Sequence, residues 1–567
     1  MRKYTFSLFI MVLFVVQSVV QSSAQNSNPK QSLSQKFEQA VAKVNDALRT
    51  VESSSKQYLQ SIDVSRSGIM KVTIEEISKK GKSLLKSYEF NIADIDKQAL
   101  RAVPKKDLIL ISMNALRKQK LIKQTVGAKK VSYINKFVFY ARDINNGREL
   151  EGLMKATRPY ALDIVEQRLS VSSYADHIRW LENNIGEVNL SKENYSQTFK
   201  SLPDYPGSIK FEKSISTTRS AKTKTYIFNL ATLNVSSVLY SMSGEKFGIS
   251  VSTKNAMKSI KYFEDDVQKS YTKKITIICE TIEQARDLQI VLKGVIPMAS
   301  KKFNAEIKPI DSFTKGTEIL NSTVGSIQIN NSSVQQYFKG NCLMEFSAEV
   351  ASNGKIKQEI YHFNMIDLNN HSIKIGSKGI LLFLLVETQK KERYIKFYSD
   401  GTQKSYTKSF KIFVPNIEDA IILKSAFSDL IGICIKNRKS FVVPPKLEMY
   451  KMLKENIGEI QNGKTSYAQN IEIAEDETVL KFKNIVVTEK SSKEKRYEVN
   501  LSDLDAKSVS MRTSDKSVLV TVKTKRLEKI IKYYEDDKVK SYQKEIEIRA
   551  ADIENARLIV NLLKNIL

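Results

Sequence analysis

Tyr88-Glu89-Phe90-Asn91-Ile92-Ala93-Asp94 occurs in four related versions along this chain of 567 residues. The others begin at Tyr226, Tyr361 and Tyr497, and each reads Tyr-x-Phe-Asn except the last, which reads Tyr-x-Val-Asn. Subtracting the tyrosine numbers gives spacings of 138, 135 and 136 positions, and no gap is needed from each tyrosine to the end of its repeat. A period of this length is typical of a whole domain and not of a solenoid turn.

The spacing predicts four tandem domains after a short N-terminal segment. We name these segments repeats 1 to 4, and their ranges are 33–168, 169–303, 304–439 and 440–567. A helix is expected at the start of each repeat, as a linker from the repeat before it. In repeat 4, Pro444-Pro445 leads into apolar residues spaced three and four apart, namely Leu447, Tyr450, Leu453, Ile457 and Ile460.

Repeat 4 shows the strand pattern most clearly. Val518, Val520 and Val522 lie two positions apart, so they share one face of a strand. The other repeats keep this face apolar, with Ile109, Ile111 and Met113; Phe247, Ile249 and Val251; and Leu382, Leu384 and Val386. A second strand is predicted over 540–549, where Tyr542 shares a face with Ile546 and Ile548. Its aligned tyrosines, Tyr133, Tyr271 and Tyr406, are interpreted as core or rim residues.

A helix start follows this last strand in every repeat. The aligned residues Asp143, Thr281, Asn416 and Asp552 can all accept hydrogen bonds from the free amides of a first helical turn. Behind Asp552, apolar residues recur at helical spacing, at Ile553, Ala556, Ile559, Leu563 and Ile566. In repeat 1 we expect Pro159 to cut the helix short.

The predicted strands of repeat 4 lie at 467–474, 479–489, 495–500, 507–512, 517–524, 528–534 and 540–549. Sequential strands on short loops normally pair antiparallel. The predicted class is therefore α+β. Seven antiparallel strands closed by one C-terminal helix resemble the pleckstrin-homology-like superfold in the order of elements, over about 100 residues of each repeat. The alternative is another curved antiparallel sheet packed by a helix. The resemblance implies a binding module, but it identifies no ligand-contacting residue.

The N-terminal 24 residues indicate export. Arg2 and Lys3 precede an apolar run, and Ser22-Ser23-Ala24 precedes Gln25. This pattern is typical of a secretory signal peptide and predicts cleavage after Ala24. The alternative is an uncleaved membrane anchor, which Gln17 and Gln21 disfavour because they interrupt the run. No later run of eighteen apolar residues occurs, so we expect a soluble periplasmic or extracellular protein.

Charge and cysteine content bear on the class of partner and on the fold. The chain has 90 Lys and Arg against 62 Asp and Glu, a formal net charge of +28. Such a surface would attract polyanions, although the basic pairs are scattered in a way that favours a solvated surface. The cysteines are Cys279, Cys342 and Cys434. A bridge between Cys342 and Cys434 is possible in an exported protein, while buried thiols are the favoured interpretation.

Two aligned polar positions are candidates for site residues. The asparagines at 91, 229, 364 and 500 end a strand before a tight turn, where an Asn side chain bonds nearby backbone, so we predict a structural role. Arginines recur at 148, 286 and 557 in the final helix, but repeat 3 has Ile421 there. Pairing with an acidic side chain is favoured over an anion site.

The remaining candidates are weak. The Glu-Asp-Asp triplets at 264–266 and 535–537 lack the pattern of a calcium loop and are predicted to be solvated turns. His177, His362 and His371 have no aligned histidine or cysteine partner. The sequence therefore names no catalytic, cofactor-binding or metal-ligating residue and no cofactor.

Three functions remain open. The leading hypothesis is a non-catalytic exported binding or scaffold protein of the cell envelope, with an envelope glycan, lipid or protein as partner. The second is a polyanion binder that uses a basic stripe to hold acidic polysaccharide, lipopolysaccharide or extracellular nucleic acid. The third is a hydrolase with its carboxylates in an inter-domain cleft.

Overall fold

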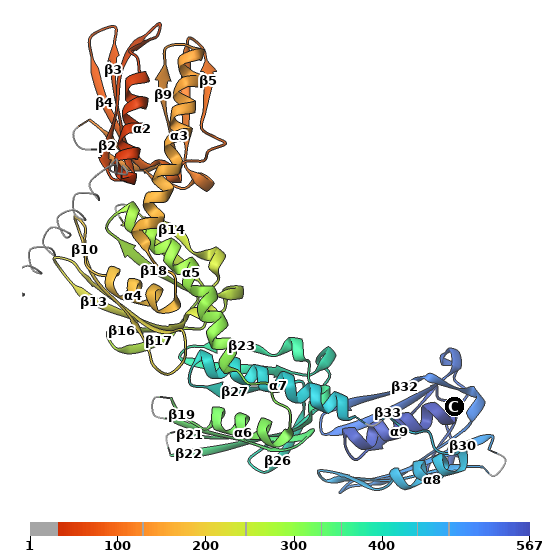
Figure 1. Ribbon diagram of the computed structural model, residues 1–567. Coiled ribbons are helices and arrows are strands. Elements are labelled where there is room, and N and C mark those ends of the chain that lie inside the picture. Colours follow the sequence, from red (N-terminus) through yellow and green to blue (C-terminus); the bar gives the residue numbers. More distant parts are fainter. Residues whose placement is uncertain are drawn as a thin grey trace, which may run out of the picture. The chain divides into compact units, whose positions relative to one another are not determined.

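The computed structural model describes residues 32–127, 130–243, 246–329, 332–352, 354–438, 440–474 and 477–567 (Figure 1). The predicted signal peptide lies outside the described residues. The chain forms two compact units, each of which is described by itself. Unit 1 comprises Met1–Trp180, Met242–Gly248 and Cys279–Val291; unit 2 comprises Leu181–Ser241, Ile249–Ile278 and Leu292–Leu567.

The fold class is α+β, as predicted. Eight α-helices lie in the described residues. They are α2 (Leu33–Ala47), α3 (Ile144–Leu169), α4 (Tyr174–Asn184), α5 (Ile282–Glu306), α6 (Phe313–Val324), α7 (Ile417–Asn437), α8 (Lys446–Asn456) and α9 (Ile553–Ile566). None of the described helices is long and apolar enough to cross a membrane.

Antiparallel six-stranded sheets recur along the chain with one strand order. In each, four consecutive strands form a meander, and the fourth pairs with the seventh strand of its set. The strands are β1 (Val51–Glu52), β2 (Lys56–Arg66), β3 (Ile69–Ser78), β4 (Ser83–Asn91), β7 (Ile122–Val126), β8 (Lys130–Ile134); β10 (Val188–Asn189), β11 (Asn194–Ser201), β12 (Ser208–Ser216), β13 (Ala221–Asn229), β16 (Ile260–Glu264), β17 (Val267–Thr272); β19 (Ser326–Ile329), β20 (Ser332–Gly340), β21 (Leu343–Ser352), β22 (Lys355–Asn364), β25 (Ile395–Ser399), β26 (Thr402–Thr407); and β28 (Ile460–Asn462), β29 (Thr465–Ile473), β30 (Val479–Val487), β31 (Ser492–Asn500), β34 (Lys532–Glu535), β35 (Lys538–Val539).

Three-stranded sheets hold the remaining strands, and in each the middle strand pairs with the last strand of the set. They are β5 (Arg101–Lys105), β6 (Leu108–Asn114), β9 (Lys136–Ala141); β14 (Leu239–Ser243), β15 (Lys246–Ser252), β18 (Lys274–Cys279); β23 (Lys374–Lys378), β24 (Leu381–Glu387), β27 (Ser409–Val414); and β32 (Leu504–Ser514), β33 (Ser517–Thr524), β36 (Glu545–Ala550).

The structure corrects two details of the predicted strand set. Only the second half of the predicted strand 540–549 is a strand, β36, and the preceding β35 ends at Val539 and belongs to the other sheet. The chain crosses from one sheet to the other here, so its pairing partner changes. In addition, β31 pairs with β34 and not with β32, so the pairing of sequential strands is interrupted after the fourth strand and resumes with β32 and β33. Repeat 4 has nine strands in its described residues, where seven were predicted, because β28 and β35 were not expected.

The predicted apolar strand face is buried. Val518, Val520 and Val522 on β33 are at most 1% exposed, and their aligned residues are also buried except Ile109, which is half-buried. In β33 the opposite face is buried as well, because Leu519 and Thr521 are covered. β33 and its equivalent β15 are therefore covered on both faces, whereas the opposite faces of β6 and β24 are only partly buried.

The predicted helix caps are confirmed in all four repeats. Amides of the first turn donate to the side chains of Asp143 (2.9 Å), Thr281 (3.1 Å), Asn416 (2.7 Å) and Asp552 (2.8 Å). The expected effect of Pro159 is wrong, because α3 continues through it to Leu169. Beyond the proline, α3 buries Ala161, Val165 and Leu169. This packing offsets the backbone hydrogen bond that proline removes.

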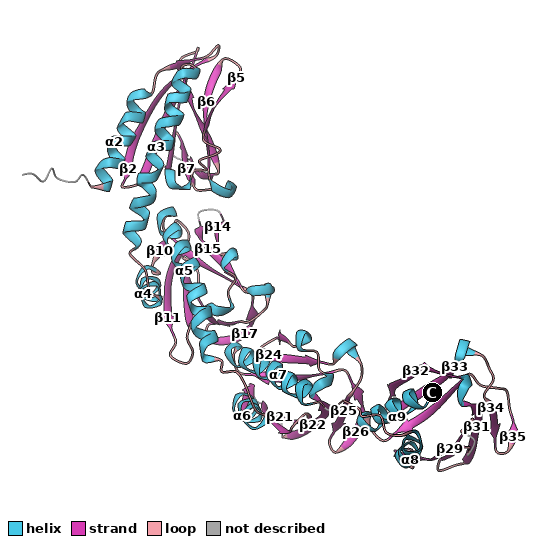
Figure 2. Ribbon diagram, turned by 45° about the vertical axis from the view of Figure 1, so that its right-hand side comes forward, coloured by secondary structure: helices cyan, strands magenta, loops and turns pink. Residues whose placement is uncertain are grey.

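The helix at the start of each repeat packs into that repeat's core. In repeat 3, Leu320 and Val324 of α6 join side chains of both sheets and of α7 in one buried cluster. In repeat 4, Met449 and Leu453 of α8 join the cluster that contains α9. Helices α8 and α9 pack against each other (Figure 2). The predicted linker helices are thus also core elements.

A disulfide joins Cys342, next to β21, to Cys434 of α7. The favoured interpretation of buried thiols is therefore wrong for these two cysteines, whereas Cys279 is a buried thiol. The alternative bridge is found because the fold brings the two Cα atoms within 5.6 Å, which is ordinary disulfide spacing. A sequence separation of 92 residues gives no hint of this approach.

Candidate functional site

Polar bonds recur where the Asn-led turn of one repeat meets the final helix of the next. We call each such place a joint. The first joint lies between repeats 1 and 2, and all the contacts given for it fall within unit 1. The second and third joints, between repeats 2 and 3 and between repeats 3 and 4, lie within unit 2.

The aligned asparagine shapes the turn side of each joint. Asn91 and Asn229 accept from the amides of Ala93 and Ala231, each at 2.8 Å, and Asn364 accepts from that of Ile366 at 3.2 Å. This geometry confirms the predicted backbone-bonding role in three repeats. It holds the last residue of the turn, Asp94 in repeat 1, toward the next repeat's helix.

The first joint is an arginine–carboxylate fork. Arg286 Nε donates to Asp94 Oδ1 at 2.8 Å, and Arg286 Nη2 donates to Asp94 Oδ2. Both side chains are buried. A second pair joins Arg168 of α3 to Asp287, with 2.5 Å between Nη2 and Oδ1. Bidentate arginine bonds fix orientation as well as distance, so the fork sets how the helix meets the turn.

The third joint repeats this arrangement. Arg557 donates to Asp367 and to Glu554, and Asn364 Nδ2 donates to Glu554 Oε1 at 2.9 Å. Burial raises the pKa of Asp367 above its ordinary value, against the opposing effect of the Arg557 charge. The partner of each arginine was predicted to be an acidic side chain, and this is confirmed for Arg286 and Arg557.

The second joint is built without the arginine fork. Thr232 stands at the turn position and Ile421 at the helix position. Glu418 instead accepts from Asn229 Nδ2 at 3.0 Å and from the Ser208 hydroxyl.

A tyrosine bond completes the second joint. Tyr205 Oη donates to Asp419 Oδ1 at 2.8 Å. Burial raises the pKa of Asp419, with the adjacent Glu418 charge acting in the same direction and the Tyr205 bond opposing it. Two neighbouring buried carboxylates thus replace the ion pair of the other joints.

The strand tyrosines also reach across the joints. Tyr133 stacks on Phe247 of repeat 2, with ring centroids 5.7 Å apart. Tyr271 belongs to the buried cluster of repeat 3, and Tyr406 belongs to that of repeat 4. Burial raises the pKa of Tyr271 to about 12. These residues were predicted to be core or rim residues, and the structure places Tyr271 and Tyr406 in the buried cluster of the next repeat.

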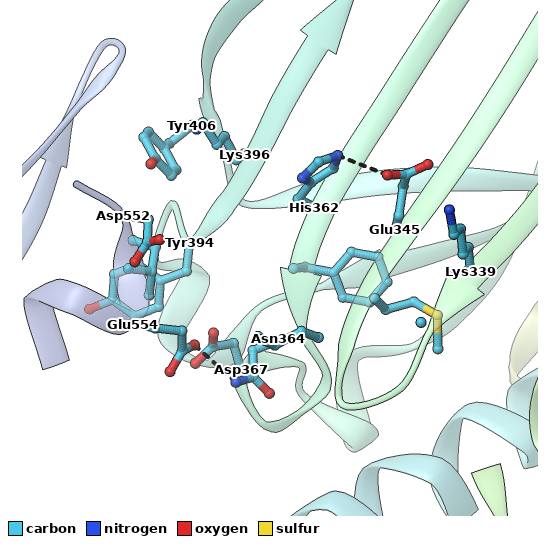
Figure 3. A pocket seen from close by; sticks show the side chains of 15 residues that line it. Lys339, Glu345, His362, Asn364, Asp367, Tyr394, Lys396, Tyr406, Asp552 and Glu554 are labelled. Atoms are coloured by element: carbon cyan, nitrogen blue, oxygen red, sulfur yellow. Dashed lines mark hydrogen bonds and ion pairs between the residues drawn. The ribbon is translucent and has the colours of Figure 1, made fainter. Parts of the chain in front are cut away.

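A cavity of about 400 Å³ lies at the third joint (Figure 3). Its walls combine the aromatic rings of Phe363, Tyr394 and Tyr406 with carboxylates from both repeats. The lining residues are Lys339, Gly340, Leu343, Met344, Glu345, His362, Phe363, Asn364, Asp367, Tyr394, Lys396, Tyr406, Asp552, Ile553 and Glu554. Its size falls within the ordinary range for small-molecule sites.

Most of the cavity's carboxylates already have partners. Glu345 Oε2 lies 3.2 Å from His362 Nε2, and Glu554 accepts from Asn364 (Figure 3). Asp552 caps α9. The exception is Asp367 Oδ2, which is buried and has no hydrogen-bond partner among the described residues. A buried carboxylate oxygen without a donor is costly, so a donor group placed there would be favoured.

The other candidate residues have local roles. The Asp residues of the Glu-Asp-Asp turns bond backbone, since the Thr223 and Glu494 amides donate to Asp265 and Asp536 at 2.8 and 2.9 Å. His177 is buried on α4 with Nδ1 2.7 Å from the Ser173 carbonyl. Within the described ranges no group of three or more His, Cys, Asp or Glu side chains is placed to hold a metal ion.

Sequence reasoning missed the acidic half of each joint. In the sequence alone, Asp94 and Asp367 look like turn residues, and nothing distinguishes Glu418 from other helical glutamates. One signal is present in the alignment of the repeats: the turn residue reads Asp, Thr, Asp while the helix residue of the following repeat reads Arg, Ile, Arg. The two positions change together, as contacting residues do.

No protein-family model, curated protein or solved structure matches this chain.

Proposed function

We propose that this protein is a non-catalytic, exported binding or scaffold protein of the cell envelope. Its four tandem modules, each resembling the pleckstrin-homology-like superfold, are joined by the contacts described above. The proposal rests on one observation: the charged side chains at the joints bind other side chains of the protein. At the first and third joints the buried acids accept from arginines, and at the second they accept from Asn229, Ser208 and Tyr205, which is the arrangement of a structural joint and not of a reaction centre.

The cavity at the third joint is the proposed binding site. Asp367 lines the cavity and its buried Oδ2 has no donor partner among the described residues, while Phe363, Tyr394 and Tyr406 supply apolar rings. A ligand that fits this chemistry carries amino or hydroxyl groups on a compact apolar frame, as amino sugars do. Because the walls come from two repeats, ligand binding would also stabilise the joint.

The polyanion alternative draws on the net charge alone. Many lysines form ion pairs with nearby glutamates, among them Lys222 with Glu264, Lys357 with Glu359 and Lys483 with Glu494. Such pairing reduces the positive potential that a polyanion would meet. The hydrolase alternative needs carboxylates that are available to substrate, and those of this cavity are mostly engaged.

The test is a titration of the protein with glucosamine and its short oligomers, with heparin as the polyanion probe, by calorimetry. Leu343 lies at the cavity and is well exposed, so Leu343→Trp should fill the opening and abolish binding of the amino sugar. Ile356→Trp is the matched control, since Ile356 is a similarly exposed aliphatic residue that does not line the cavity. Cleavage of the oligomer by the wild-type protein, or binding of heparin alone, would refute the proposal.

A further inference from the structure

Among the described residues, two surfaces that would form a joint have no neighbouring repeat: the helix end of repeat 1 and the turn end of repeat 4. The helix end of repeat 1 corresponds to the surface that repeats 2, 3 and 4 use to meet the repeat before them. The turn end of repeat 4 corresponds to the surface that repeats 1, 2 and 3 use to meet the repeat after them. In the described residues, no segment covers either end in the way that a joint does.

The helix end of repeat 1 is more exposed to solvent than the helix ends of the other repeats. Ile144 begins α3 and is 38% exposed. Its aligned residues at the three joints are buried, at 8% for Ile282, 4% for Ile417 and 7% for Ile553. Arg148 is exposed and forms no ion pair in the described part of the chain, whereas its equivalents Arg286 and Arg557 are paired.

The turn end of repeat 4 shows the same contrast. Tyr542 is 49% exposed, whereas its equivalents Tyr271 and Tyr406 are 6% and 3% exposed because the next repeat covers them. Asn500 is exposed and makes no cap bond with its side chain, unlike the buried Asn229. Asp503 occupies the position of Asp94 and Asp367 and, among the described residues, forms no ion pair.

The charges of the two uncovered ends match. Asp at the turn occurs with Arg in the following helix at the first and third joints, and both are absent together at the second. The uncovered ends carry Asp503 and Arg148, so they hold the two halves of the same fork. One position differs, because Asn145 stands where the joints have glutamate. Opposite Asn500 it would offer an amide, which can both donate and accept.

We propose that the turn end of repeat 4 in one copy binds the helix end of repeat 1 in a second copy of this chain. Asp503 and Arg148 form the ion pair of this interface, and Tyr542 packs against the half-buried Ile109, which corresponds to the Phe247 that Tyr133 stacks on. The contact is head-to-tail, so it builds open chains or closed rings of copies and not two-fold dimers. This interface does not depend on the proposed ligand site.

Sedimentation velocity of residues 25–567, the form left by the predicted cleavage, tests the proposal. The expected result is a mass that rises with protein concentration from about 1 to 300 µM and falls with added salt, as an ion pair at an interface requires. Arg148→Asp and Asp503→Arg should each weaken association at least about tenfold. Tyr542→Ser should also weaken it, through lost apolar contact.

The decisive variant combines both reversals in one chain. Arg148→Asp with Asp503→Arg recreates the pair with opposite polarity, so association should return toward the wild-type level. Arg219→Asp is the control for charge alone, because Arg219 is an exposed turn residue away from both ends. A wild-type protein that stays monomeric throughout, or association that the single reversals leave unchanged, overturns the proposal.

Discussion

The guanidinium of Arg557 binds the carboxylate of Asp367 across 190 positions of sequence. Both groups are buried or nearly so, and the pair holds the final helix of repeat 4 against the turn of repeat 3. The same bond joins Arg286 to Asp94 at the first joint. The second joint has Thr232 and Ile421 at these two positions and therefore shows how a joint is built without the ion pair.

Removing one partner of the ion pair at the third joint should lower the free energy of unfolding. Arg557→Ile leaves the Asp367 charge buried without its partner, and such a loss typically lowers the free energy of unfolding by about 3–5 kcal/mol. The double variant Asp367→Thr with Arg557→Ile copies the second joint and should lose much less. Urea unfolding followed by circular dichroism measures four proteins: wild type, Asp367→Thr, Arg557→Ile and the double variant.

The control for this cycle is Arg512→Ile. Arg512 pairs with Glu547, but both side chains are exposed, so its loss should cost less than about 1 kcal/mol. If the double variant were as unstable as the sum of its single changes, the two residues would not be coupled and the joint would owe nothing to the pair.

The second joint should be pH-dependent through Asp419. Burial raises its pKa in the folded protein, whereas in the unfolded chain the pKa is about 4. The folded state then binds more protons between these two pKa values, so the free energy of unfolding falls as pH rises from about 4 through the folded pKa. The stability of wild type relative to Asp419→Asn should decline by about 1.4 kcal/mol for each pH step of one between the two pKa values.

Urea titrations of both proteins at several values between about pH 4 and pH 7.5 give this difference directly. Subtracting the variant cancels groups that do not interact with Asp419 and so titrate alike in the two proteins. A difference that grows with pH would mean that the charged form of Asp419 is the stabilised one.

The Cys342–Cys434 bridge should stabilise repeat 3. It closes a long loop, since its cysteines are 92 positions apart, and the loss of such a bridge typically costs about 2–5 kcal/mol. The double change of Cys342 and Cys434 to serine should therefore lower the unfolding midpoint, and a reductant should lower that of wild type to a similar level. A wild-type midpoint indifferent to reductant would show that the bridge is absent or without effect.

Gly207 should tolerate no side chain. Its φ is +88°, and an added Cβ would lie 2.7 Å from Asn229 Oδ1, inside the second joint. Gly354 has a similar φ of +74° but open space around it. Gly207→Ala should thus cost about 1–3 kcal/mol more than Gly354→Ala, the difference reporting crowding alone. Equal costs in urea unfolding would place the whole effect in the backbone.

Local signals in the sequence predicted local structure well. Asp143 and Asp552 were predicted to cap helices because a cap needs only an acceptor three residues before a free amide, and both do so. The valine face of β33 followed from the period of two. Pro159 misled because the apolar residues behind it in α3 outweigh its missing amide.

The sequence predicted the aligned arginine of the ion pair at the first and third joints but not its acidic partner. Arg286 and Arg557 were expected to pair with acids, but the sequence could not say which, because Asp94 and Asp367 are 192 and 190 positions away. Tyr271 was expected to be a core or rim residue without a named neighbour, since a period of two gives a face and not the identity of what covers it. Those contacts depend on how one segment meets the next, which no local pattern records.

The polarity of the Asp–Arg fork bears on how such a chain can lengthen. Each module that carries aspartate on its turn and arginine on its helix is compatible with another of its kind at either side. If such a module were duplicated in frame, the aspartate of one copy could therefore pair with the arginine of the next, without any new substitution. At the second joint, by contrast, Thr232 and Ile421 replace the aspartate and the arginine, so repeats 2 and 3 fit each other specifically. Replacing one of them by a module with the charged residue would place a buried charge opposite Thr232 or Ile421.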